Sequence, residues 1–108
     1  MKRCEMVKDK DLFNKIIKTG KYNKDSNFVI YHLDNRENKY AHFGIAIKNS
    51  LGDAVLRNRL KRQTRVLIDN NKKLFKNDRD YIIMIRKGCL ESSFDEMNYS
   101  LINIMKGN

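Results

Sequence analysis

Apolar residues recur at two different spacings along the chain, and the change in spacing predicts where helices and strands alternate. Four apolar residues between positions 12 and 17 follow helical spacing, with Asp9 or Asp11 as a candidate N-cap and Gly20 as a stop. Residues 27–33 and 40–47 are instead β-branched and aromatic, with a polar turn between them, and they predict neighbouring antiparallel strands. A weaker signal predicts a short strand at residues 21–23.

Alternation along residues 40–47 sorts their side chains onto two faces of a sheet. One face carries the large residues that must be buried, which are Phe43, Ile45 and Ile47. The other face is a candidate floor for a groove and carries the smaller residues His42, Gly44 and Ala46. In the preceding strand, Val29, Tyr31 and Leu33 share one face, but alternation alone leaves open whether that face meets the groove.

The second half of the chain predicts a long helix, a buried strand and a closing helix. Asp53 is a good N-cap for a helix over residues 54–75, and residues 80–86 form a continuous apolar run that suits a central strand. Ser93 and Glu96 resemble a capping box ahead of an apolar stripe at helical spacing. The sequence therefore predicts an α/β two-layer sandwich in the order αβββαβα, with three helices on a mixed sheet of about four strands and a crossover joining parallel strands.

Composition limits the classes of protein that fit this pattern. The chain has 108 residues, of which 41% are apolar, so it can form a core, and it lacks proline, linkers and repeats. We therefore expect residues 1–108 to form a single domain. The lack of a long apolar run argues against a membrane span or a signal peptide. Cys4 and Cys89 are far apart and suggest neither a disulfide framework nor a zinc site, which favours the cytoplasm.

The distribution of charge is the sequence feature that most directly indicates a partner. The 23 Lys and Arg residues outnumber the 13 Asp and Glu residues, and five cations with no acid fall within residues 57–65. On a helix anchored through Leu56, Leu60 and Leu67, most of these cations fall on one sector away from the leucines. Arginine predominates, and its planar guanidinium suits phosphate and bases, so nucleic acid is favoured over a membrane surface as the partner. No helix-turn-helix or zinc finger points to DNA.

Residues 52–65, with the core Arg57-Asn58-Arg59 followed by Lys61-Arg62, resemble the signature of the bacterial ribonuclease P protein subunit. The run ending in Gly20, the strand containing Tyr31 and the strand at residues 80–83 are similar to other elements of that family. The resemblance implies a left-handed βαβ crossover around the basic helix, whereas general statistics favour a right-handed one. It also implies the maturation of the 5′ ends of precursor tRNAs, with magnesium-dependent hydrolysis carried out by an RNA subunit.

The resemblance implies two sets of binding residues. The catalytic RNA would be bound by the basic helix through Arg57, Asn58, Arg59, Lys61, Arg62 and Arg65. The single-stranded 5′ leader of precursor tRNA would lie in a central cleft formed by Phe13, Val29 and Tyr31. We expect neither a membrane nor DNA as a partner, and no catalytic or metal-binding residue on the protein itself.

Three departures from the family pattern involve four positions. Asn49 and Ser50 stand where the family often has lysines, Asp53 replaces an asparagine, and Ile17 replaces an aromatic residue, so leader binding could be weaker.

A nuclease that acts without RNA would need paired carboxylates, and the acids here are scattered. The alternatives are a structural RNA-binding protein of the ribosomal type, which the composition fits equally well, and a peripheral membrane protein.

Overall fold

The computed structural model describes residues 5–107, so Cys4 lies outside the described residues. Three helices and four strands occur in the predicted order, with short 3-10 helices in the connections. The elements are α1 (Lys10–Thr19), β1 (Lys21–Lys24), β2 (Phe28–Asp34), β3 (His42–Ile47), η2 (Asn49–Leu51), α2 (Ala54–Asn70), η3 (Lys72–Leu74), β4 (Arg79–Ile85), η4 (Lys87–Leu90) and α3 (Phe94–Lys106).

The four strands form one mixed sheet in the order β1-β2-β4-β3. β4 pairs antiparallel with β2 and parallel with β3, so the continuous apolar run lies at the centre of the sheet as predicted. The prediction that β2 and β3 are neighbours is wrong. β2 and β3 are antiparallel to each other, but β4 lies between them. The apolar residues of β4 can be buried on both faces of the sheet only if this strand is central.

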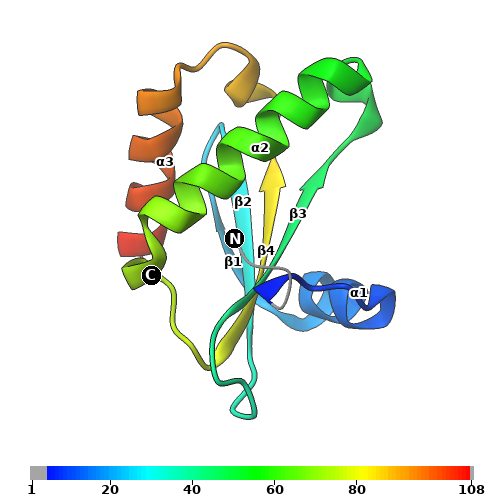
Figure 1. The fold of residues 1–108 in the computed structure, drawn as a ribbon, viewed down its shortest axis with the longest axis vertical. Helices are drawn as coiled ribbons and strands as arrows, with labels where there is room; N and C mark the ends of the chain where they lie inside the picture. Colours follow the sequence, from blue (N-terminus) through cyan, green and yellow to red (C-terminus); the bar gives the residue numbers. More distant parts are fainter. Residues whose placement is uncertain (1–4, 108) are drawn as a thin grey trace.

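The crossover from β3 through α2 to β4 is left-handed. In Figure 1 both strands point upward, β4 lies to the left of β3, and α2 passes in front of the sheet between them. This agrees with the handedness implied by the family resemblance, and it differs from the usual right-handed connection.

α2 and α3 cover one face of the sheet, where the main hydrophobic core lies. Phe43 and Tyr81 stack with ring centroids 5.7 Å apart, and Phe75 meets both rings edge-on at 5.0 Å. Leu60 and Leu67 of α2 join this core, as predicted, and Leu56 packs against its margin. The predicted helical face is therefore confirmed.

α2 ends at Asn70, five residues before the predicted end. The side chain of Asn71 caps this end by donating hydrogen bonds to the Leu67 carbonyl at 2.8 Å and to the Asn98 side chain at 2.9 Å. The chain then turns through η3 into β4, which lets Phe75 reach the aromatic core. The other helix boundaries match closely: Asp9 caps α1, Gly20 ends it, and Ser93 and Glu96 form the capping box of α3.

α1 packs on the opposite face of the sheet, where it covers only part of the surface. Ile16 is fully buried there, and the ring of Phe13 lies over Gly44, so close that a Cβ on this glycine would lie 3.1 Å from Phe13 Cε2. Gly44 therefore serves as a docking point for α1. The prediction that Gly44 forms a groove floor is wrong, because Phe13 covers it.

Candidate nucleic-acid interface

α2 presents its charged side chains because its apolar side is fixed in the core. The carboxylate of Asp53 caps the helix by accepting a hydrogen bond from Leu56 N at 2.9 Å. Leu60, Thr64 and Leu67 are buried, and the Thr64 hydroxyl is satisfied by the Leu60 carbonyl at 2.8 Å. The remaining sector of the helix therefore faces away from the core.

The structure brings the six residues of the predicted basic motif onto this one helix. Four are exposed, namely Asn58, Arg59, Arg62 and Arg65, while Arg57 and Lys61 are half-buried. Within residues 5–107, no carboxylate forms an ion pair with any of the five cations. Uncompensated positive charge on a rigid helix is suited to binding a phosphate backbone.

Arg57 differs from the other cations of the helix. Its Nε donates a hydrogen bond to the carbonyl of Gly52 at 3.1 Å, and its Nη1 donates to Oδ1 of Asn49 at 2.7 Å. The side chain is therefore folded back over η2 and orders the turn that precedes the helix.

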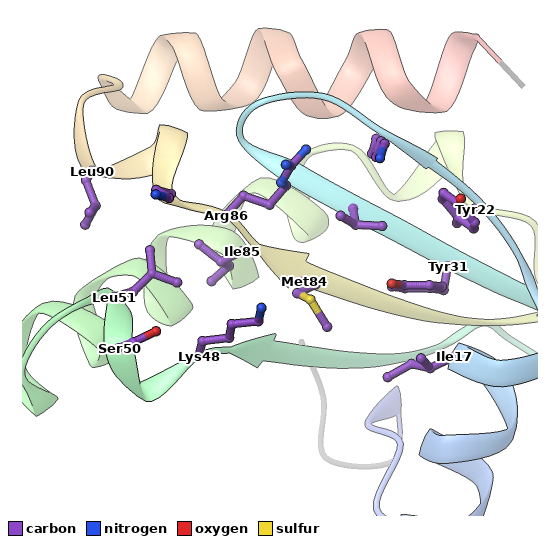
Figure 2. Close-up of a pocket in the computed structure, with 13 residues that line it drawn as sticks. Ile17, Tyr22, Tyr31, Lys48, Ser50, Leu51, Met84, Ile85, Arg86 and Leu90 are labelled. Carbon is purple, nitrogen blue, oxygen red and sulfur yellow. The ribbon is translucent and has the colours of Figure 1, made fainter.

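A cavity of about 800 Å³ opens on the sheet face that α1 leaves uncovered (Figure 2). Its apolar lining comes from α1, from the sheet and from η2 and η4, and includes Ile17, Val29, Met84, Leu51 and Leu90. The strand register explains this lining, since Met84 pairs with Val29 across β2 and β4. The face with Val29 and Tyr31, which alternation left undecided, is therefore the face of the cavity.

Two tyrosines form one side of this cavity. Tyr22 and Tyr31 are directly opposite each other in the β1–β2 register, and their ring centroids lie 5.6 Å apart with a tilt of 45° between the planes. Tyr22 is 55% exposed and Tyr31 is half-buried. Exposed aromatic rings beside an apolar floor can stack with unpaired bases.

Cations surround the apolar part of the cavity. Lys24, Lys48, Arg86 and Lys87 all line it, and Figure 2 shows Lys48 extending into it from the end of β3. Arg86 also donates a hydrogen bond to the backbone carbonyl of Asp25, which holds its guanidinium near the end of β4. Aromatic rings for bases and cations for phosphates thus occur together.

Two of the three residues predicted for the cleft, Val29 and Tyr31, line this cavity. Phe13 does not line it, because the ring is engaged with Gly44 beneath α1. The cavity also contains residues that sequence reasoning missed, notably Tyr22 and the cations Lys24, Lys48 and Arg86. Tyr22 follows only from the pairing of β1 with β2, since its strand is weakly signalled in the sequence.

The buried carboxylate of Asp80 lies outside the cavity and serves a structural role. Asp80 is 1% exposed and accepts hydrogen bonds from Nδ2 of Asn35 at 3.0 Å and of Asn38 at 2.7 Å. Nδ1 of His42 lies 3.2 Å from the same carboxylate. These contacts fix the β2–β3 connection onto β4. Among residues 5–107, no group of three or more His, Cys, Asp or Glu side chains could hold a metal ion.

Burial shifts the pKa of two further side chains, Cys89 and His32. Burial raises the pKa of the Cys89 thiol to about 12, and the thiol donates a hydrogen bond to the Asn27 carbonyl at 3.1 Å. Burial also lowers the pKa of His32, which lies on the core face.

In the part of the chain that the structure describes, no helix is long and apolar enough to cross a membrane.

The comparisons with known proteins give one consistent answer. A family model for ribonuclease P matches residues 1–107. The chain belongs to the ribonuclease P protein family. The ribonuclease P protein component of Bacillus cereus (strain 03BB102) is 36% identical over 106 residues, which cover 98% of this chain and 92% of that protein. As a ribonuclease P protein component, the chain is part of an endoribonuclease of tRNA processing, and it has an RNA partner.

Solved ribonuclease P proteins share the fold. The protein from Staphylococcus aureus has a TM-score of 0.86 at 28% identity and covers 94% of this chain and 93% of its own. The protein from Thermotoga maritima has a TM-score of 0.85 at 29% identity, with coverage of 96% and 97%. These similarities confirm the predicted α/β fold, and the alternative of a ribosomal-type RNA-binding protein is not favoured.

Proposed function

We propose that α2 binds the catalytic RNA subunit of ribonuclease P. The residues assigned to this contact are Arg57, Asn58, Arg59, Lys61, Arg62 and Arg65. The absence of carboxylate partners among the described residues supports this assignment, because each cation can then displace counterions from an RNA phosphate. Arg57 has a second task, which is to order the turn at Asn49.

The cavity is the proposed site for the single-stranded 5′ leader of precursor tRNA. The observation that carries this proposal is the pair Tyr22 and Tyr31 on an apolar floor with four cations around it. Rings of this kind stack with bases of any sequence, while the cations bind the backbone. Val29 contributes to the floor, and Phe13 contributes indirectly by fixing α1, which forms one side of the cavity through Ile17.

Magnesium in the proposed reaction is held by the RNA, together with the substrate phosphate. Among residues 5–107 no group of three or more His, Cys, Asp or Glu side chains could hold it, and both oxygens of the buried Asp80 already accept hydrogen bonds from amide groups. The protein's part is therefore to orient the leader and to lower the electrostatic cost of bringing two RNAs together. The proposed location of this assembly is the cytoplasm.

Reconstitution tests the proposal. A bacterial catalytic RNA and a precursor tRNA are incubated at low magnesium concentration with and without the purified chain. We expect cleavage at the 5′ end of the mature tRNA to be faster with the protein, and we expect no cleavage by protein without RNA. Failure of the protein to increase cleavage, or cleavage by the nuclease-treated protein alone, would contradict the proposal.

A further inference from the structure

A second group of cations lies around a separate pocket of about 250 Å³. Lys21, Lys76 and Arg79 line it together with His32, and none of these residues lines the cavity assigned to the leader. The apolar side of the pocket is formed by Leu74 and Met105. A pocket with three cations and an imidazole is chemically distinct from the tyrosine-lined cavity.

The strand register places these residues on the helix-covered face of the sheet. Lys21 is opposite His32 in the β1–β2 pairing, and His32 is opposite Tyr81, whose ring is part of the main core. Arg79 begins β4, whereas the β4 residues that line the leader cavity, Met84 and Ile85, are at the other end of that strand. The pocket therefore lies on the opposite face of the sheet from the leader cavity.

A hydrogen bond and a contact between two rings fix the walls of the pocket. The backbone N–H of Lys76 donates a hydrogen bond to the hydroxyl of Tyr81 at 2.9 Å, which fixes the chain before β4 while the lysine side chain is exposed. The ring centroids of His32 and Tyr81 are 6.1 Å apart, and His32 is only 9% exposed. The imidazole thus forms a rigid wall of the pocket.

The side chains around this pocket carry more positive than negative charge. Arg79 Nε donates a hydrogen bond to Oδ1 of Asp34 at 2.9 Å, and Asp34 is the one carboxylate among the described residues whose charge acts on His32. Burial lowers the pKa of His32 most, and the charges of Arg79, Lys21 and Lys76 lower it further, against the opposing effect of Asp34. Three neighbouring cations thus disfavour protonation of the imidazole. A bound anion would offset their positive charge, so the pocket is suited to binding one.

We propose that the pocket between Lys21, His32, Lys76 and Arg79 binds a phosphate group. Two lysines and an arginine supply charge-assisted donors, and His32 adds a donor when it is protonated. The phosphate can come from the RNA backbone or from a small phosphate anion. The first source depends on the proposed RNA-binding function, whereas the second does not.

The first experiment uses the whole chain without RNA and inorganic sulfate as the probe, since sulfate has the same tetrahedral oxyanion and a constant charge near neutral pH. Chloride keeps the ionic strength constant. The ring signals of both histidines are followed by NMR during pH titration. We expect sulfate to raise the pKa of His32, because a bound anion favours the imidazolium, and to leave His42 on the opposite face unchanged.

Lys76→Ala is the test variant, because only its backbone takes part in the fold. We expect this variant to bind sulfate about threefold or more weakly, in line with the loss of one partly exposed charge. Lys10→Ala, on the first turn of α1, removes an equal charge from the opposite face and should bind sulfate like the unmodified chain.

The second experiment identifies the source of the phosphate. The affinity of the catalytic RNA for both variants is measured across salt concentrations. If an RNA phosphate occupies the pocket, Lys76→Ala lowers the slope of log affinity against log salt by about 1, and Lys10→Ala does not. Sulfate binding with an unchanged slope would assign the pocket to a small anion. Equal sulfate responses of His32 and His42 together with an unchanged slope would overturn the proposal, without bearing on the function of α2.

Discussion

Arg57 donates a hydrogen bond to Asn49 across the junction between η2 and α2, at 2.7 Å. Asn49 directly precedes Ser50 and Leu51, which line the leader cavity. One arginine of the basic helix therefore also supports the edge of the cavity, whereas Arg65, two turns further along, is simply exposed. The two arginines should consequently respond differently to mutation.

Arg57→Ala and Arg65→Ala should each weaken binding to the catalytic RNA and lower its salt slope by about 1, because each removes one phosphate contact. Only Arg57→Ala should also reduce the preference for precursor over mature tRNA, since it frees the turn at Asn49. The measurement is RNA affinity across salt concentrations, followed by tRNA affinity of the reconstituted holoenzyme.

Asn49→Ala separates these two effects. It breaks the contact with Arg57 while it leaves the positive charge in place, so it should change the precursor preference and preserve the salt slope. An equal precursor preference in Arg57→Ala and Arg65→Ala holoenzymes would show that the hydrogen bond does not support the cavity.

Tyr31→Ala and Tyr22→Ala should weaken binding of precursor tRNA by about 1–3 kcal/mol, the range for a base stacked on an aromatic ring. Mature tRNA lacks the leader, so its affinity should not change. The affinity ratio of precursor to mature tRNA in the holoenzyme measures the effect.

Tyr99→Ala provides the matched control for the tyrosines. Tyr99 is 69% exposed on α3, away from the cavity, and its removal should leave the ratio unchanged. If all three variants gave the same ratio and remained folded, the tyrosine pair would have no part in leader binding.

The helix caps and the central strand could be predicted from sequence because their causes are local. Asp9, Asp53 and Ser93 cap helices through hydrogen bonds to residues two or three positions away, and the run in β4 is apolar over its whole length. Such signals are independent of the rest of the fold. The basic sector of α2 follows in the same way from helical geometry.

The arrangement of strands and part of the cavity depend on distant residues. β4 separates β2 from β3 although Arg79, its first residue, is 45 positions after Asp34 at the end of β2, and no local signal shows this pairing. Tyr22 joins the cavity only through its pairing with Tyr31. Phe13 and Gly44 engage each other because α1 docks on the sheet, so a small residue that suggested an open groove is instead a contact site.

Asp80→Ala should destabilise the fold, although Asp80 lies outside both proposed RNA sites. The buried carboxylate accepts hydrogen bonds from Asn35 and Asn38, and its loss would leave Asn38 with only the long contact to the Arg79 carbonyl at 3.5 Å and remove the acceptor of Asn35. We expect a decrease of about 2–3 kcal/mol in the free energy of unfolding, measured in urea.

The exposed carboxylate Asp34 provides the comparison for Asp80. It is 71% exposed and pairs with Arg79 on the surface, so Asp34→Ala should cost about 1 kcal/mol or less. Similar losses for the two variants would show that burial of Asp80 has no energetic consequence.

Glu96 should give α3 a pH-dependent contribution to stability. Its Oε1 accepts a hydrogen bond from the backbone N–H of Ser93 at 2.9 Å, and Ser93 Oγ accepts one from Glu96 N at 3.1 Å. Hydrogen bonds that Ser93 donates to the carboxylate, first from its backbone N–H and then from its side chain, lower the pKa of Glu96 from its ordinary value of 4.5. Because the folded-state pKa is the lower one, the contribution is complete above pH 4.5 and is lost as the pH falls through the folded-state pKa.

Glu96→Gln isolates this effect, since glutamine can accept the Ser93 hydrogen bond but does not titrate. Urea unfolding of both proteins is compared from neutral pH to well below pH 4.5. We expect the advantage of the unmodified chain over Glu96→Gln to be present near neutral pH and to disappear in acid. Glu91→Gln, at the residue that follows η4 and outside the capping box, is the control variant measured over the same pH range. If the difference for Glu96→Gln were independent of pH, the charge of Glu96 would not strengthen the capping box.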